Sequence, residues 1–117
     1  MTQPSRTPGQ AAAEAEERPL IARAAAGDTA AFRVLVERHQ SRAYALAYRF
    51  VGTAHDAEEV AQDAFVKVWN ALPGFRGESR FTTWLHRIVA RCALDRLDVL
   101  RRRRARETVE EAAAHVA

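Results

Sequence analysis

The sequence contains little cysteine and no long apolar run. Its single cysteine, Cys92, excludes a disulfide or zinc-ribbon framework, and the apolar neighbours of this residue favour a small buried side chain. No window approaches the ~18 consecutive apolar residues that a membrane span requires. No apolar stretch follows a basic start, as it would in a signal peptide. We therefore expect a soluble, cytoplasmic protein without a membrane partner.

Clusters of catalytic or metal-binding residues are also missing. The four histidines, at positions 39, 55, 86 and 115, are scattered without a ligand spacing. The sequence has no nucleophile–base pair and no phosphate-cradling glycine motif. It therefore predicts neither an enzyme nor a protein that holds a metal or another cofactor.

Large apolar residues are absent from the first seventeen positions, MTQPSRTPGQAAAEAEE. Such a segment cannot bury enough surface to offset the entropy cost of ordering the chain. We predict a disordered leader over 1–17 and one small domain over 18–101. Apolar periodicity thins beyond that point, so we predict a linker or frayed helix, basic and then acidic, over 102–117.

Strand-type alternation is missing as well, whereas apolar residues recur at spacings of three and four from Leu20 almost to Leu100. This period predicts an all-α fold, a compact bundle of about four helices. Capping and breaking residues bound the expected helices: 19–26, 28–52, 56–73 and from 81 onward. Asp28 and Asp56 are the expected N-caps of the second and third helices.

Charge is distributed unevenly along the chain. Between Arg76 and Arg106, ten arginines stand against three acidic residues, a balance of +7. Residues 1–75 carry a net charge of −1, and the last eleven residues carry −3. The segment that follows the third expected helix is therefore the one that should seek phosphate.

Two adjoining segments carry a family resemblance: DAEEVAQDAFVKVWNAL (56–72) and PGFRGESRFTTWLHRIVARCALDRL (73–97). Together they resemble region 2 of bacterial RNA polymerase sigma factors of the extracytoplasmic-function (ECF) group. The resemblance runs from about Leu20 to Arg101. It implies a transcription initiation domain that binds the clamp helices of the largest subunit of core RNA polymerase. It also implies recognition and melting of the −10 promoter element through capture of the non-template single strand, and regulation by an anti-sigma factor.

The third expected helix holds the polymerase-binding residues that the resemblance implies: Asp56, Glu59, Gln62 and Asp63. Gln62 and Asp63 fit the solvent-facing side of this helix, whereas Phe65 fits the core. An exposed amide and carboxylate suit a basic coiled-coil partner. The structural alternative is a solvated helix face with an aspartate cap, and this alternative is favoured for Asp56.

The loop and the last helix hold the DNA-binding residues that the resemblance implies: Arg76, Gly77, Glu78, Ser79, Arg80, Arg87, Arg91 and Asp95. Glycine lets backbone N–H groups approach a flipped base, and the loop arginines offer phosphate contacts. Glu78 and Ser79 can bond a base edge. The structural alternative is an ordinary surface turn in which Ser79 caps the last helix.

Three arginines of the last segment, Arg80, Arg87 and Arg91, are expected on one helix face, where a DNA backbone would meet repeated guanidinium groups. Pairing of Arg91 with Asp95 along the helix is the structural alternative. Trp84 could stack on unpaired bases, but its position on the apolar stripe favours the core.

The sequence departs from the family pattern at two positions. Arg91 stands where asparagine is common, so base preference there is open, because arginine donates only. Asp98 stands where a basic residue is usual. The family's helix-turn-helix domain, which reads the −35 element, is absent, so we expect an excised region 2 or part of a longer protein. The alternative function is a helical protein-interaction module or anti-sigma target without direct DNA reading.

Overall fold

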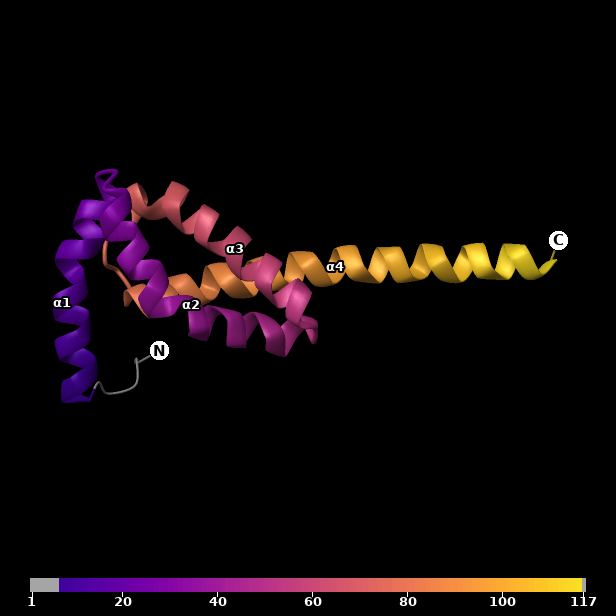
Figure 1. The fold of residues 1–117 in the computed structure, drawn as a ribbon, viewed down its shortest axis with the longest axis horizontal. Coiled ribbons are helices and arrows are strands. Elements are labelled where there is room, and N and C mark those ends of the chain that lie inside the picture. Colours follow the sequence, from indigo (N-terminus) through magenta and orange to yellow (C-terminus); the bar gives the residue numbers. More distant parts are fainter. Residues whose placement is uncertain (1–6, 117) are drawn as a thin grey trace.

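The computed structural model describes residues 7–116 and confirms the predicted all-α fold. The helices are α1 (Pro8–Ala25), α2 (Thr29–Val51), α3 (Ala54–Ala71) and α4 (Phe81–Val116), and a single 3₁₀ turn, Leu72–Gly74, follows α3. Figure 1 shows α1, α2, α3 and the first part of α4 gathered at one end, while the rest of α4 projects away. Within the described range, no helix is long and apolar enough to cross a membrane.

The limits of α2 and α3 follow from local hydrogen bonding. Asp28 caps α2, as predicted, because its carboxylate accepts from the backbone N–H groups of Ala30 and Ala31 at 3.0 and 3.1 Å. Gly52 ends α2 with a φ of +79°, a left-handed conformation that favours glycine. The N-cap of α3 is Thr53, whose hydroxyl accepts from the backbone N–H of Asp56 at 3.3 Å. The prediction of Asp56 as this cap is therefore wrong.

The first helix begins eleven residues earlier than predicted, at Pro8 and not at Pro19. Thr7 and Gln10 form a capping box: the Thr7 hydroxyl accepts from the Gln10 backbone at 3.1 Å, and the Gln10 amide oxygen accepts from the Thr7 backbone at 2.9 Å. This helix corrects the disordered leader predicted over 1–17, of which residues 1–6 lie outside the described residues. Burial of Glu17 and Ala24 fixes α1, although neither side chain is large and apolar.

The core lies where α2, α3 and α4 meet. Its largest fully buried side chains are Leu35, Val60, Val68, Leu72, Leu85 and Val89, and burying each contributes about 1.5–3 kcal/mol. Fully buried alanines on the same helices leave room for close approach: Ala43, Ala47, Ala57, Ala64 and Ala93. Cys92 is 6% exposed, and burial raises the pKa of its thiol, which confirms the prediction of a small buried side chain.

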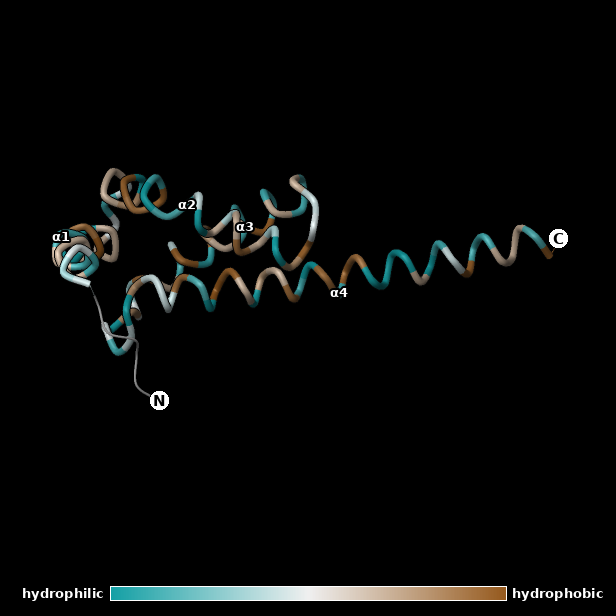
Figure 2. The backbone as a smooth tube through the Cα atoms, turned by 90° about the horizontal axis from the view of Figure 1, so that it is seen from below, coloured by the Kyte–Doolittle hydropathy of each residue, from teal (hydrophilic) through white to brown (hydrophobic). Residues whose placement is uncertain are grey.

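The last helix, α4, extends beyond the bundle that it helps to form. Its buried side chains end at Ala93, and every described residue from Arg101 onward is exposed. Of the two alternatives predicted over 102–117, a linker and a frayed helix, the structure shows a helix: α4 continues to Val116, and Ala117 lies outside the described residues. Alanine, glutamate and arginine favour helix without tertiary support. Figure 2 shows this part of α4 running clear of the other helices.

Candidate nucleic-acid interface

The loop between the 3₁₀ turn and α4 is held by backbone geometry and by aromatic packing. Gly77 has a φ of +74°, a conformation that side-chain-bearing residues rarely adopt. The Phe75 ring contacts Trp84 and Phe81, with ring centroids 4.8 and 5.9 Å apart. These contacts seat the loop on the first turn of α4, so the polar side chains around Gly77 project from a fixed base.

A hollow of about 540 Å³, which we name the loop pocket, lies between this loop and α4. Its lining residues are Gly74, Phe75, Arg76, Glu78, Ser79, Trp84 and Arg87. The pocket thus combines two guanidinium groups, a carboxylate, a hydroxyl and an aromatic wall. Trp84 is half-buried: it packs against Phe75 and Phe81, in line with the core prediction, and it also lines this pocket.

A second hollow, of about 450 Å³, continues along α4 and contains Arg87, Arg91 and Lys67. Lys67 comes from α3, and the sequence analysis did not select it, because only packing brings this lone lysine beside the arginines of α4. Its ammonium group lies 4.0 Å from the Asp95 carboxylate. The structure therefore pairs Asp95 with Lys67, whereas the sequence alternative paired it with Arg91.

Arg80 lies on the opposite side of the loop, against α1. Its Nε lies 3.6 Å from the Glu14 carboxylate, and its side chain is 14% exposed. It lines a third hollow, of about 400 Å³, between the loop and α1. The expectation that Arg80 shares a face with Arg87 and Arg91 is therefore wrong. The reason is that Arg80 precedes α4: its carbonyl accepts the first helical bond, from the Trp84 N–H at 3.0 Å.

Ser79 does not occupy the capping position predicted for it. Its hydroxyl donates to the Arg80 carbonyl at 3.4 Å. Because Arg80 is the residue directly before the helix, Ser79 stands one position further out and lines both the loop pocket and the hollow beside α1. Ser79 therefore lies where its hydroxyl can meet a ligand on either side of the loop.

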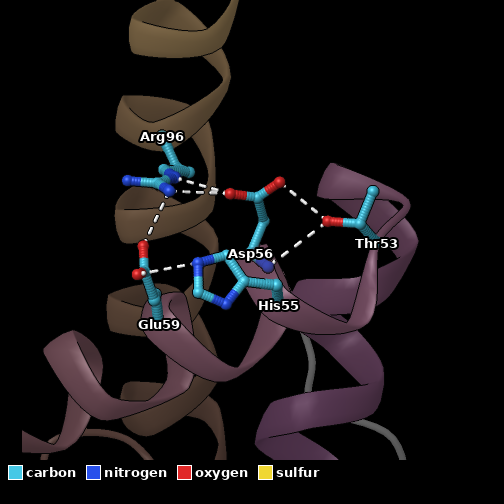
Figure 3. Close-up of polar contacts among 5 residues, drawn as sticks. All are labelled: Thr53, His55, Asp56, Glu59 and Arg96. Atoms are coloured by element: carbon cyan, nitrogen blue, oxygen red, sulfur yellow. Dashed lines mark hydrogen bonds and ion pairs between the residues drawn. The ribbon is translucent and has the colours of Figure 1, made fainter.

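Two of the four predicted polymerase-binding residues, Asp56 and Glu59, are joined to α4. Arg96 donates to Asp56 at 2.7 and 3.0 Å and lies 2.7 Å from the Glu59 carboxylate (Figure 3). The hydroxyl of Thr53 donates to Asp56 at 2.7 Å and, with Arg96, holds the pKa of that carboxyl below its usual value. The bond to Asp56 in turn raises the pKa of Arg96. Asp56 thus fastens α3 to α4, and it is neither part of a solvated helix face nor the cap that the structural alternative predicted.

The other two residues, Gln62 and Asp63, are exposed on α3. Gln62 borders a hollow of about 840 Å³, which we name the α2–α3 groove. The apolar residues that line the groove are Phe32, Val36, Tyr44, Ala61, Phe65, Val66 and Trp69. Phe65 is half-buried there and not fully in the core, and Val66 is 61% exposed. The sequence analysis missed this groove, although an apolar Val66 on the polar side of the helix was a signal for it.

Comparison with known proteins identifies the class to which this fold and loop belong. The model of sigma-70 region 2 matches residues 35–106, more than half of the chain, so the chain belongs to the sigma-70 region 2 family. Among the similar proteins is the RNA polymerase sigma-H factor of Pseudomonas aeruginosa, which is 43% identical over 82 residues. That match covers 70% of this chain and 42% of the relative.

Other relatives identify the ECF group within this family. The ECF RNA polymerase sigma-E factor of Escherichia coli is 43% identical over 74 residues, covering 63% of this chain and 38% of the relative. The ECF RNA polymerase sigma factor SigW of Bacillus subtilis is 37% identical over 71 residues, covering 61% and 38%. The chain thus spans less than half the length of these curated relatives. Sigma factors are non-enzymatic initiation factors, and membership agrees with the prediction that this chain is not an enzyme.

Two solved structures share the fold. An engineered region 2 of sigmaE in complex with GTAAAA is 37% identical, with a TM-score of 0.70, and the match covers 74% of this chain and 90% of that one. CnrH in complex with the cytosolic domain of CnrY is 35% identical, with a TM-score of 0.63, covering 73% and 60%. The first of these is a nucleic-acid complex, and the second is a protein complex.

Proposed function

We propose that this domain acts in bacterial transcription initiation, where it binds core RNA polymerase and captures the unpaired non-template strand of the −10 promoter element. The loop pocket would accept a flipped base, with the Glu78 carboxylate and the Ser79 hydroxyl at its edge and Trp84 beneath it. Arg76 and Arg87 would contact the neighbouring phosphates. By this proposal the protein works in the cytoplasm, where it meets the polymerase.

One observation carries this proposal: polar, cationic and aromatic groups meet in a single hollow beside the loop. In a relative with the same fold, the engineered sigmaE region 2, the partner is GTAAAA. Trapping a base that has already left the stack would shift the equilibrium of duplex opening, because the bound state lies on the open side. Such a domain needs no catalytic group.

The polymerase contact would lie on the exposed face of α3. Gln62 and Asp63 project there, whereas Asp56 is turned toward Arg96. An exposed amide and an exposed carboxylate can form charge-assisted hydrogen bonds with a basic coiled coil, such as the polymerase clamp helices. The apolar α2–α3 groove begins beside Gln62 and would add buried surface to the same contact.

A binding screen against short single strands with randomised −10 positions, run at two salt concentrations, tests the DNA part of the proposal. Each phosphate contact with a single strand contributes about 0.7 to the salt slope, so four to six contacts give a slope near −3 to −4. Arg87→Ala should reduce the slope by less than one unit, whereas Arg49→Ala, an exposed arginine of α2, serves as the matched control. Equal affinity for every sequence, or an unchanged Arg87→Ala slope, would contradict the proposal.

The α2–α3 groove favours a second candidate function, a protein-interaction module that an anti-sigma factor occupies. The groove is larger and more apolar than the loop pocket, and CnrH, a relative of the same fold, is in complex with the cytosolic domain of CnrY. Binding to polymerase without any preference among DNA sequences would favour this second function. Selective binding of one −10 single strand would favour the first.

A further inference from the structure

Five arginines surround α4 just beyond the bundle: Arg101, Arg102, Arg103, Arg104 and Arg106. We name this set the arginine collar. All five are exposed, and within residues 7–116 none of their guanidinium groups makes an ion pair or a ring contact. From the collar we propose a second nucleic-acid site, one that binds the phosphate backbone of double-stranded DNA beside the strand held at the loop pocket. This proposal rests on the proposed function for its location.

The collar concentrates five positive charges on a short length of helix. Six helical positions span about 7.5 Å along the axis at the α-helical rise. Because the side chains surround the helix, a duplex along one side of α4, with ~1.7 Å of axis per phosphate charge, meets only those that face it, such as Arg102 and Arg106. Like charges at i,i+3 and i,i+4, such as Arg101 with Arg104 and Arg102 with Arg106, destabilise the helix locally by tenths of a kcal/mol. A bound phosphate backbone removes that repulsion.

The collar continues the basic side of α4 after an acidic interruption. Arg102 lies eleven positions beyond Arg91, about three helical turns, so both project from the same side about 16 Å apart. Asp95 and Asp98 lie between them and would repel a phosphate. A strand at Arg87 and Arg91 and a backbone at the collar are therefore two separate contacts. One elongated DNA molecule can reach both only if it runs along α4.

Neutralisation by the acidic residues that follow is the competing explanation. Glu107 and Glu110 are placed to pair with Arg103 and Arg106 at i,i+4, but arginine before glutamate is the weaker order for such pairs. Arg101 and Arg102 lie beyond the i,i+4 reach of Glu107. Asp98 precedes them by three and four positions, but among the described residues it forms no ion pair with either arginine. These two arginines therefore carry the proposal, and they are the residues to change.

The test compares the wild-type chain, Arg101→Gln/Arg102→Gln and the matched control Arg33→Gln/Arg49→Gln on a duplex that lacks any −10 sequence. Each phosphate contact with duplex DNA contributes about 0.9 to the salt slope, so losing two lowers the slope by about 1.8. Between 50 and 200 mM salt, the ratio of wild-type to variant affinity should then shrink about tenfold. Arg33→Gln/Arg49→Gln should keep the salt slope of the wild type. Arg101→Lys/Arg102→Lys should restore most of the slope, because a point charge is enough to bind phosphate.

Binding measurements with a single-stranded −10 oligonucleotide distinguish this proposal from the proposed function. Wild-type binding to the duplex that depends on Arg101 and Arg102, without selective binding of any single strand, supports the collar and removes the loop-pocket function. If Arg101→Gln/Arg102→Gln binds duplex DNA with the same salt slope as the wild type, the collar proposal is wrong. This holds even if that variant binds polymerase or anionic vesicles less well. Circular dichroism confirms that the fully exposed substitutions leave α4 helical.

Discussion

His39 of α2 holds both carboxylate oxygens of Glu17 of α1, with its Nε2 at 3.0 and 2.9 Å from them. Both residues are nearly inaccessible, at 6% and 7% exposure. The histidine ring also packs against Phe81 at a centroid distance of 5.3 Å, and Arg38 lies 3.6 Å from Glu17. A polar pair thus joins α1 to the bundle directly behind the first turn of α4.

Glu17→Ala should release α1 from α2, because it leaves the His39 Nε2 buried without its partner. The loss of such a bond costs about 1–3 kcal/mol. Hydrogen exchange should accelerate first in α1, and thermal unfolding should shift downward. Glu16→Ala removes a side chain that is 70% exposed and provides the control. Unchanged exchange in α1 would show that other contacts hold this helix.

Asp56→Asn and Arg96→Gln should each destabilise the packing of α3 on α4. The double variant should lose less free energy of unfolding than the sum of the two single losses. For a partly exposed pair we expect a coupling energy of about 1 kcal/mol, measured by a double-mutant cycle in urea. Because the pKa of Asp56 in the folded state lies below its usual 3.8, its contribution is complete above that value and is lost as pH falls through the lowered pKa. Additive effects at neutral pH would contradict the bridge.

Asp63→Ala should weaken the binding of core polymerase about tenfold, the loss of one charge-assisted hydrogen bond. The free energy of unfolding should hardly change, because the side chain is exposed. Titration of labelled protein with core polymerase measures the first quantity, and urea unfolding measures the second. Glu37→Ala, an exposed carboxylate on α2, is the control. Equal effects of both substitutions would point to net charge and not to a contact at α3.

His86 should make the fold sensitive to mild acid. Burial lowers its pKa below 6.5, and the electrostatic influence of the nearby His39 and Arg42 adds to this effect. The neutral form is favoured in the folded state, so stability is complete above pH 6.5 and falls as the unfolded chain takes up a proton below that value. His86→Leu should flatten the curve of unfolding free energy between pH 7 and about pH 5. A curve as steep as that of the wild type would show that His86 does not cause the sensitivity to acid.

The sequence was sufficient where short-range rules decide the outcome. Helical spacing predicted α2, α3 and the start of α4, and local hydrogen bonding made Asp28 a cap and Gly52 a terminus. It failed for the part of α1 before Pro19, because the one buried side chain there is that of Glu17, which a pattern of large apolar residues cannot reveal. The sequence placed Arg80 on the wrong face because its partner, Glu14, lies in the segment that was expected to be disordered.

The site was predicted in composition more than in arrangement. The sequence selected Glu78, Ser79 and Arg87, which line one pocket. It could not supply Lys67, because the approach of that residue to α4 depends on how two helices cross. It also could not identify Arg96 as the partner of Asp56, since spacing along α3 does not tell which carboxylate meets an arginine of α4.

The two tryptophans of the chain stand at different candidate surfaces, Trp84 in the wall of the loop pocket and Trp69 in the α2–α3 groove. Each indole is half-buried and packed against a phenylalanine, Trp84 on Phe75 and Trp69 on Phe32. The protein therefore contains an intrinsic fluorophore for each surface. With Trp69 replaced by phenylalanine, emission follows occupancy of the loop pocket alone. The reciprocal replacement isolates the groove, so each surface can be titrated without a dye in its own single-tryptophan variant.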